Sequence, residues 1–147
     1  MESRVERPRH GPGRIHPVRA LLISPDPKVR EWVALAARSA ARRVGEEFET
    51  LEASDGVTGL AVAWRDLPDV VVADEIASRA GAFAVAMDLK GADPPFPGSV
   101  IILLDRVQDE WLARWSGADA WFVKPVNPFE LGDAVASLVE AGHKEAV

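Results

Sequence analysis

The sequence contains no cysteine, and its three histidines all lie outside the apolar segments. The absence of cysteine excludes disulfides, thiolate metal sites and a cysteine nucleophile. His10 and His16 precede the first apolar segment and His143 follows the last, so no histidine is placed for acid–base catalysis or metal binding. The stretch 24–27, SPDP, also lacks the glycines of a phosphate-binding loop. We therefore do not expect a nucleotide-dependent enzyme.

Long apolar runs and a positive net charge are missing as well. The longest apolar runs, such as residues 100–104, are far too short to span a bilayer, and the N-terminus has no apolar signal-peptide core. The net charge of −6 argues against general affinity for nucleic acid or anionic membranes. We expect a cytoplasmic protein, a location that the lack of cysteine suits, with no membrane contact and no direct binding of nucleic acid.

The first 17 residues are predicted to form a disordered basic tail. They carry proline, glycine and four arginines against two glutamates, without any apolar period. A basic tail can touch nucleic acid or an acidic partner, but a solvated leader is the simpler interpretation. The remaining chain, residues 18–143, is long enough for one domain with a complete core, and we expect no second domain after it.

From residue 18 onward, apolar segments with strand patterns alternate with amphipathic segments of helical period. Five strands and five helices in strict alternation predict an α/β fold with a parallel sheet and helices on both faces. The segment 48–54 alternates in polarity and is expected at the sheet edge, whereas 69–74 is apolar throughout and is expected at the centre. The predicted strands are 18–24, 48–54, 69–74, 100–105 and 120–125, and the predicted helices are 29–44, 55–64, 83–90, 107–117 and 127–142.

Charged side chains follow four of these strands. In open parallel sheets, ligands bind outside the carboxyl ends of the strands, where Asp26, Asp74, Asp105 and Lys124 should gather. Carboxylates suit Mg²⁺, and a lysine can neutralise a phosphoryl group. Because a carboxylate at the end of the most buried strand needs a compensating partner, we favour a functional role for Asp74. For Asp26 and Asp105 we favour the role of helix N-caps. Lys124 should point along the sheet edge toward a carboxylate.

Three stretches in order, LEASDGVTGL (51–60), PDVVVAD (68–74) and GADAWFVKPVNPFEL (117–131), resemble the receiver domain of bacterial two-component response regulators. The resemblance covers residues 18–142. It implies a flavodoxin-like fold with strand order 2-1-3-4-5 and a non-enzymatic signalling module. Asp74 would be the phospho-acceptor and Lys124 the lysine that contacts the phosphoryl group. The implied partners are a sensor kinase and a downstream regulator, and the implied cofactor is Mg²⁺.

The sequence also departs from the family pattern. Receivers place two adjacent acids after the first strand to hold Mg²⁺, whereas this chain has Ser24-Pro25, and only a one-residue shift would make Asp26 the second acid. Leu104 stands where the family uses a threonine or serine that reports phosphorylation. Asp105 follows it, where it could repel a phosphoryl group, donate a metal ligand or pair with Lys124. Asp26 and Asp74 are the metal ligands that remain, so we expect weakened or lost Mg²⁺ binding and phosphorylation.

Three tryptophans mark a candidate partner surface. Trp111 and Trp115 lie one helical turn apart, and Trp121 begins the strand that follows. In the family, the last two helices and the strand between them form the usual partner or homodimer face, and tryptophan is enriched at interface hot spots. We expect one of Trp111 and Trp115 to be buried and the other exposed.

Two alternative functions stay open. One is a phosphorylation-independent pseudo-receiver, and the other is a flavodoxin-like cofactor-binding domain, against which the missing phosphate loop counts.

Overall fold

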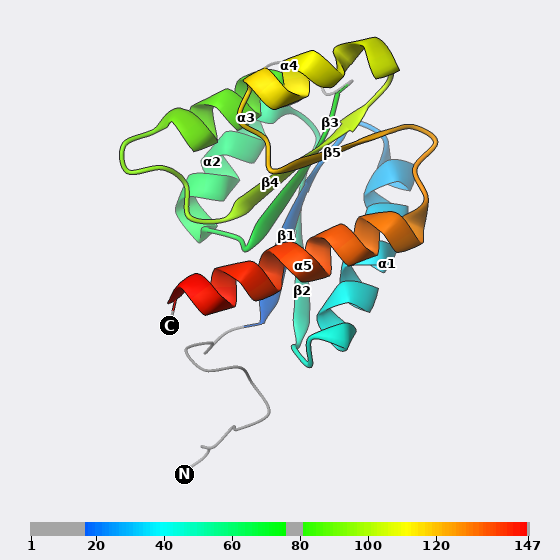
Figure 1. Ribbon diagram of the computed structural model, residues 1–147, viewed down its shortest axis with the longest axis vertical. Coiled ribbons are helices and arrows are strands. Elements are labelled where there is room, and N and C mark those ends of the chain that lie inside the picture. The colour runs from blue at the N-terminus through cyan, green and yellow to red at the C-terminus, as the bar shows by residue number, and fades with distance from the viewer. Residues whose placement is uncertain (1–16, 76–80, 147) are drawn as a thin grey trace.

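The computed structural model describes residues 17–75 and 81–146, with side chains up to residue 142. These residues form one parallel sheet of five strands in the order β2-β1-β3-β4-β5, flanked by five α-helices (Figure 1). Both the α/β class and the strand order agree with the prediction. The strands are β1 (Val18–Ile23), β2 (Phe48–Ala53), β3 (Val70–Asp74), β4 (Ser99–Leu104) and β5 (Ala120–Val123). The helices are α1 (Pro27–Arg43), α2 (Gly56–Asp66), α3 (Ala82–Gly91), α4 (Glu110–Trp115) and α5 (Pro128–Ala146).

The strand β3 lies at the centre of the sheet. It pairs in parallel with β1 on one side and with β4 on the other, and all five of its residues are buried. Its continuous apolar run suits a strand that is covered on both faces. The half-polar strand β2 lies at one edge, as its alternating sequence predicted. This arrangement places the end of β3, and therefore Asp74, in the middle of the carboxyl edge.

Two apolar layers cover the faces of the sheet. The helices α1 and α5 pack on one face, and α2, α3 and α4 pack on the other (Figure 1). Side chains alternate along each strand, so that Leu22 joins the first layer and its neighbours Leu21 and Ile23 join the second. Each layer thus buries one apolar stripe of every helix that it contains.

Local signals at the helix ends explain where two helices begin. Asp26 is the N-cap of α1, with extended backbone, and its carboxylate accepts a hydrogen bond from the Lys28 amide at 2.9 Å. Asn127 accepts from the Phe129 amide at 2.8 Å and caps α5 in the same way. A proline occupies the first helical position after each cap, where its missing N–H costs nothing. The cap at Asp26 was predicted from the sequence, and the last predicted helical segment begins at Asn127.

The remaining predicted segments agree with the structure to within a few residues, with one difference in shape. The segment 107–117 begins with a short 3₁₀ turn, Val107–Asp109, before it continues as the six-residue helix α4. The predicted tail falls almost entirely on residues 1–16, which lie outside the described residues. In the described part of the chain, no helix combines the length and the apolar character needed to cross a membrane.

Candidate functional site

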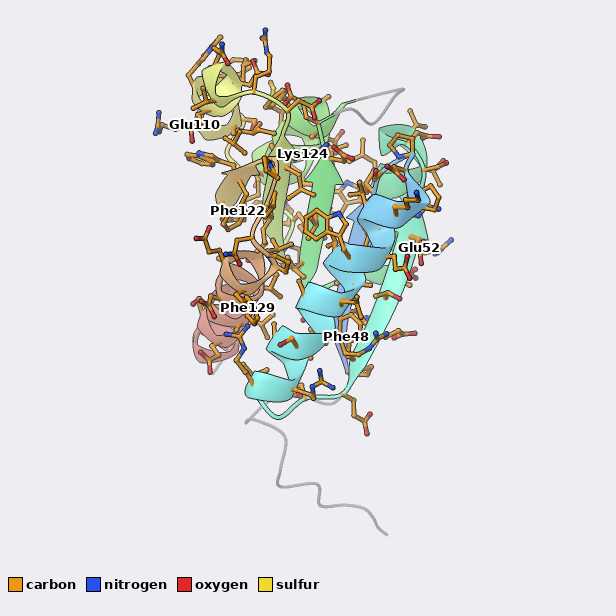
Figure 2. The ribbon with its side chains drawn as sticks, turned by 90° about the vertical axis from the view of Figure 1, so that its right-hand side faces the viewer. Phe48, Glu52, Glu110, Phe122, Lys124 and Phe129 are labelled. Atoms are coloured by element: carbon orange, nitrogen blue, oxygen red, sulfur yellow. The ribbon has the colours of Figure 1, made fainter. Side chains whose placement is uncertain are left out.

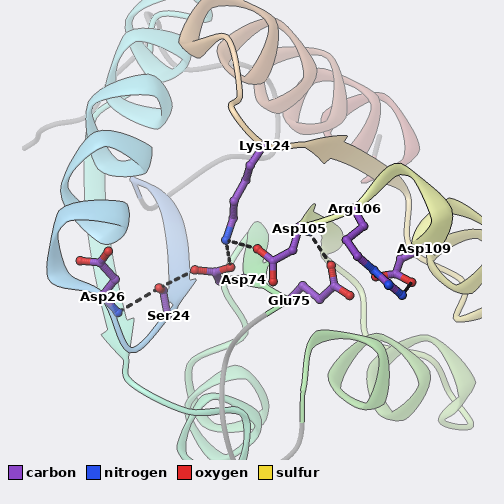
Figure 3. Close-up of polar contacts among 8 residues, drawn as sticks. All are labelled: Ser24, Asp26, Asp74, Glu75, Asp105, Arg106, Asp109 and Lys124. Carbon is purple, nitrogen blue, oxygen red and sulfur yellow. Dashed lines mark hydrogen bonds and ion pairs between the residues drawn. The ribbon is translucent and has the colours of Figure 1, made fainter.

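Four side chains from four strand ends meet at the carboxyl edge of the sheet (Figure 3). Ser24 follows β1, Asp74 ends β3, Asp105 follows β4 and Lys124 follows β5. Adjacent parallel strands end at the same edge, so residues up to 50 positions apart come into direct contact. We call these four residues the acidic pocket. The sequence placed three of them there, whereas Ser24 was noted only as a departure from the family pattern.

Asp74 is fully buried, and both of its carboxylate oxygens accept hydrogen bonds. Ser24 Oγ donates to Oδ2 at 2.7 Å, and Lys124 Nζ donates to Oδ1 in an ion pair. Burial of a carboxylate without partners would be costly, so these two contacts make its position tenable. The prediction that Asp74 requires a compensating partner, and that Lys124 points at a carboxylate, is confirmed.

Lys124 bridges two carboxylates. Its ammonium contacts Asp74 and also donates to Asp105 Oδ1 at 3.0 Å. Burial lowers the pKa of Lys124, but hydrogen bonds and charge attraction from Asp74 and Asp105 outweigh this effect and hold the pKa above its ordinary value. The ammonium therefore stays charged and links the ends of β3, β4 and β5.

The prediction that Asp105 is a helix N-cap is wrong. The N-cap of the 3₁₀ turn is Arg106, with no capping hydrogen bond from its side chain. Asp105 lies one residue too early to reach the amides of that turn, and its carboxylate pairs with Lys124 instead. Of the roles considered for Asp105, the ion pair with Lys124 is the one in the structure.

Asp26 contributes to the pocket through its backbone. Its amide donates to Ser24 Oγ at 3.1 Å, while its carboxylate turns away from Asp74 to cap α1 (Figure 3). Arg30, one turn further along α1, donates to the carbonyl oxygen of Ser24 at 2.5 Å and pairs with Glu52. These contacts hold Ser24 in place beneath Asp74.

The side chains of the acidic pocket do not fit a Mg²⁺ site. Magnesium needs a near-octahedral set of oxygen ligands, usually with one or two carboxylates free to bind it. Here the ammonium of Lys124 lies between the carboxylates of Asp74 and Asp105, and the carboxylate of Asp26 is engaged in capping. Among the described residues, no group of three or more acidic or histidine side chains could hold a metal ion.

Two further acidic residues, Glu75 and Asp109, lie beside the acidic pocket and were not predicted from the sequence. Glu75 follows Asp74 directly, and its Oε1 accepts from the amide of Asp105 at 2.5 Å. Burial, followed by a hydrogen bond with Asp109, raises the pKa of Glu75 to about 7. The hydrogen bond from Glu75 and the guanidinium of Arg106 hold the pKa of Asp109 below its ordinary value. Of these two carboxyl groups, Glu75 is therefore the one that binds a proton first as the pH falls. No local sequence signal indicates such a contact, because its partners lie 30 or more residues apart.

Three further residues lie on the strands and helices around the pocket. Leu104 is fully buried in the layer formed with α2, α3 and α4 and offers no hydroxyl to the pocket. Trp121 is half-buried, with the guanidinium of Arg114 5.4 Å from its ring centroid. Phe129, labelled in Figure 2, lies at the start of α5, is 80% exposed and was not singled out in the sequence.

The prediction that one of Trp111 and Trp115 is buried is wrong, because they are 61% and 66% exposed. Residues four positions apart share one face of a helix, and Ala113, on the other face of α4, provides its only fully buried side chain. Val107, four residues before Trp111, is also exposed. Val107, Trp111 and Trp115 therefore form an exposed apolar stripe, a feature that often marks a contact surface.

Comparisons of sequence relate this chain to bacterial signalling proteins. An uncharacterized response regulatory protein of Mycobacterium tuberculosis is 32% identical over 127 residues, which cover 84% of this chain and 92% of that protein. The response regulator PleD of Caulobacter vibrioides is 36% identical over 101 residues, or 67% of this chain. The probable transcriptional regulatory protein TcrX of M. tuberculosis is 29% identical over 111 residues, or 76% of this chain. The chain spans only 45% of TcrX and 22% of PleD. No protein-family model matches it.

Solved structures share the same fold. The receiver domain of the sensor histidine kinase PA1611 from Pseudomonas aeruginosa, solved with a magnesium ion in its active site cleft, superposes with a TM-score of 0.70 at 15% identity and covers 86% of this chain and 99% of its own. The signal receiver domain of a histidine kinase from Syntrophus aciditrophicus gives a TM-score of 0.70 at 20% identity, covering 84% and 90%. At these identities the likeness extends to the fold alone.

Proposed function

The chain belongs to the receiver domains of response regulators in two-component signalling, and on this premise we propose that it signals through protein contact without being phosphorylated. The observation that carries the proposal is the fully buried carboxylate of Asp74, which is held by Ser24 and Lys124. In this proposal, side chains of the chain itself occupy the position where other receivers bind a phosphoryl group.

The contacts of Asp74 oppose attack on a phosphodonor. A nucleophilic oxygen must be exposed to its substrate, whereas Asp74 has no exposed surface and neither of its oxygens lacks a donor. Phosphoryl transfer also depends on positioning and on charge stabilisation by a cation. The acidic pair that would hold this cation is replaced by Ser24-Pro25, and the remaining donors do not fit Mg²⁺.

The carboxylate of Asp105 offers a substitute for a bound phosphoryl group. It contacts the ammonium of Lys124 from the end of β4, at 3.0 Å, and so supplies the anion that this lysine would otherwise take from a phosphoryl oxygen. Leu104 removes the hydroxyl that would report such a group. Together these features support a pocket with one constant arrangement rather than two states switched by phosphate.

The output of the module would be a protein contact on the face of α4, β5 and α5. Members of this family interact with kinases and downstream effectors. Trp111 and Trp115 are well exposed on α4. Trp121 lies on β5, the strand that follows α4 along the chain. Large aromatic side chains of this kind provide much of the binding energy in protein interfaces. A partner protein is the proposed occupant, and a homodimer through the same face is the alternative.

A second candidate function, phosphorylation of Asp74, is supported by a different observation. Asp74 ends β3 and contacts Lys124, and these are the two positions that the resemblance assigns to the phospho-acceptor and to the phosphoryl-contacting lysine. This function would require Asp74 to leave its contact with Ser24 and a cation to bind beside it. Both steps run against the arrangement in the structure.

The two candidates differ in one direct measurement. The full chain is incubated with Mg²⁺ and acetyl phosphate, quenched, and examined by intact mass spectrometry, beside a receiver that retains the acidic pair. We expect no phosphoryl adduct on this chain while the comparison receiver is modified. An adduct that disappears in Asp74→Asn would overturn the proposal and establish Asp74 as a phospho-acceptor.

A further inference from the structure

We infer that this chain self-associates head to tail, with the exposed face of α4 in one copy packed on a second apolar surface, formed by α2 and α3, of another copy. The self-association rests on the proposed function, which gives the chain a protein partner at α4, and it names that partner as a second copy. It differs from a homodimer in which one face pairs with itself, because the two surfaces in contact are different.

The first surface is the exposed face of α4, formed by Trp111, Arg114 and Trp115. Both indoles are well exposed, and Arg114 lies three residues after Trp111 and next to Trp115, on the same side of the helix. The guanidinium of Arg114 lies 5.4 Å from the ring centroid of Trp121 and forms no ion pair among the residues that the structure describes. This α4 surface therefore presents two aromatic rings beside one positive charge.

The second surface, the α2–α3 surface, is formed by Trp64, Leu67, Met87 and Asp88. The three apolar side chains are 39%, 47% and 43% exposed. The helices α2 and α3 pack together, and the indole N–H of Trp64 donates to Asp88 at 3.3 Å. The ring of Trp64 also meets the buried ring of Phe96 edge-on, with the centroids 5.7 Å apart. Large apolar side chains are thus held on one exposed surface, a feature that marks contact sites.

Leu67 is poorly suited to the fold of a single copy. It is the C-cap of α2, and its φ of +49° lies in the left-handed region, where a helix end favours glycine or asparagine. A leucine in this conformation strains the backbone, and nearly half of its side chain stays in contact with solvent. A second copy packed here would give the side chain a larger apolar contact than a single copy provides.

The two surfaces carry opposite charges. Asp88 is exposed on α3 and, like Arg114 on α4, forms no ion pair within the described part of the chain. Three other cations close to these surfaces are already paired, Arg65 with Asp66, Lys90 with Asp119 and Arg106 with Asp109. A head-to-tail contact would bring Arg114 of one copy to Asp88 of the next, and charge complementarity of this kind fixes the register of an interface. The opposite charges therefore favour a second copy as the occupant.

A single chain cannot join its own two surfaces. The helices α2, α3 and α4 are all packed on the same face of the sheet, so their positions relative to one another are fixed (Figure 1). Two unlike, complementary surfaces that are present on every copy produce a heterologous contact, which closes into a ring or continues from copy to copy. We therefore expect self-association that increases with protein concentration.

Sedimentation velocity of the full chain tests this contact by complementation. Trp111→Ser/Trp115→Ser removes the α4 surface, and Leu67→Asn/Met87→Ser removes the α2–α3 surface, with an asparagine that suits the left-handed backbone. Each variant alone should show a dissociation constant for self-association that is raised about tenfold or more. When one variant carries a fluorescent label and the other is added unlabelled, the label should sediment as a one-to-one dimer, because each variant supplies the surface that the other lacks.

Reversal of the two charges is a second test that leaves the apolar side chains in place. Asp88→Arg and Arg114→Asp should each weaken the self-association, and the variant with both should recover it, because the ion pair between copies is reversed. Leu35→Ser removes an exposed apolar side chain from α1, on the other face of the sheet, and should leave the self-association unchanged. Circular dichroism checks that every variant is folded.

The proposal is overturned if the wild-type chain stays monomeric up to about 1 mM. It is also overturned if the two surface variants do not associate on mixing, or if Leu67→Asn/Met87→Ser self-associates as strongly as the wild type, which indicates a symmetric contact through α4. A double charge variant that is no better than the single ones would overturn the pairing of Arg114 with Asp88. No phosphodonor is used, so these outcomes are separate from that of the phosphorylation assay.

Discussion

The hydroxyl of Ser24 donates a hydrogen bond of 2.7 Å to the carboxylate of Asp74. In the receiver family, the position of Ser24 carries an acid, which would repel Asp74 unless a cation lay between them. Ser24 instead donates a hydrogen bond to the carboxylate of Asp74. Under the proposed function, the charge of Asp74 is satisfied by side chains of the chain itself, Ser24 and Lys124, in place of Mg²⁺.

Removal of the Ser24 hydroxyl should destabilise the fold. Ser24→Ala leaves an oxygen of the fully buried Asp74 without this donor, so we expect a loss of about 1 to 3 kcal/mol in the free energy of unfolding. The free energy of unfolding is measured by urea denaturation, with tryptophan fluorescence as the signal. Ser54→Ala, at an exposed position before α2, is the matched control and should change the value by less than about 0.5 kcal/mol. Equal effects of the two substitutions would show that the buried hydrogen bond has no net stabilising role.

Removal of the Lys124 side chain should lower the free energy of unfolding more than removal of the Ser24 hydroxyl. A second substitution, Asp74→Asn, should restore part of that free energy. Lys124→Met leaves the buried charge of Asp74 without its counter-ion, with an expected cost of about 3 kcal/mol. Adding Asp74→Asn removes that charge, so the double variant should be more stable than Lys124→Met alone in the same urea assay. Asp105→Asn, which weakens only the more exposed ion pair, should cost about 1 kcal/mol or less. Strictly additive losses in the double variant would contradict the pairing.

Introducing the acidic pair of the family at positions 24 and 25 should make the protein bind Mg²⁺. The double variant Ser24→Asp/Pro25→Asp supplies two carboxylates beside Asp74, and affinity for a divalent cation rises with the charge of its ligands. We expect a saturable change in tryptophan fluorescence on addition of Mg²⁺ for this variant and none for the wild-type chain. Adding Asp74→Asn to the variant should weaken the response. A wild-type chain that responds to Mg²⁺ as strongly as the variant would disprove our explanation of the pocket.

Glu75 should make stability depend on pH near neutrality. Its pKa is raised from 4.5 in an ordinary glutamate to about 7 in the folded chain, chiefly by burial. Between these values the folded state binds more protons than the unfolded state, so the free energy of unfolding should decrease as the pH rises from about 5 to about 7.5. Asp109 and Lys124 titrate outside this interval, because the pKa of Asp109 lies below its ordinary value and that of Lys124 above.

Glu75→Gln isolates this effect, because glutamine cannot titrate but preserves both hydrogen bonds. The difference in free energy of unfolding between the wild type and this variant should change with pH in the stated direction, as measured by urea denaturation at several pH values. Contributions from the histidines cancel in the difference. A difference that stays constant from about pH 5 to about pH 7.5 would contradict the raised pKa.

The roles of Asp105 and of the two α4 tryptophans show where sequence reasoning failed. An aspartate just before a helical segment is a common N-cap, but the cap preference depends on which amide is within reach, and Asp105 lies one residue too early. The tryptophans were expected to divide between core and surface, but the helix that carries them is short and exposes the face they share. Both errors concern the three-dimensional surroundings of a residue whose local conformation was predicted correctly.

The order of strands and helices, the central place of β3 and the caps Asp26 and Asn127 can be read from the chain, because periodicity and capping depend on residues close in sequence. Lys124 was expected to reach a carboxylate at this edge, but the choice of Asp105 for its second ion pair, the contact of Ser24 with Asp74 and the contact of Glu75 with the Asp105 amide could not be read from the chain. They join residues between 19 and 50 positions apart and depend on the register in which β1, β3, β4 and β5 end at one edge. The chain thus specifies a receiver fold through local patterns, whereas the state of its pocket arises from side chains that meet only once the sheet has formed.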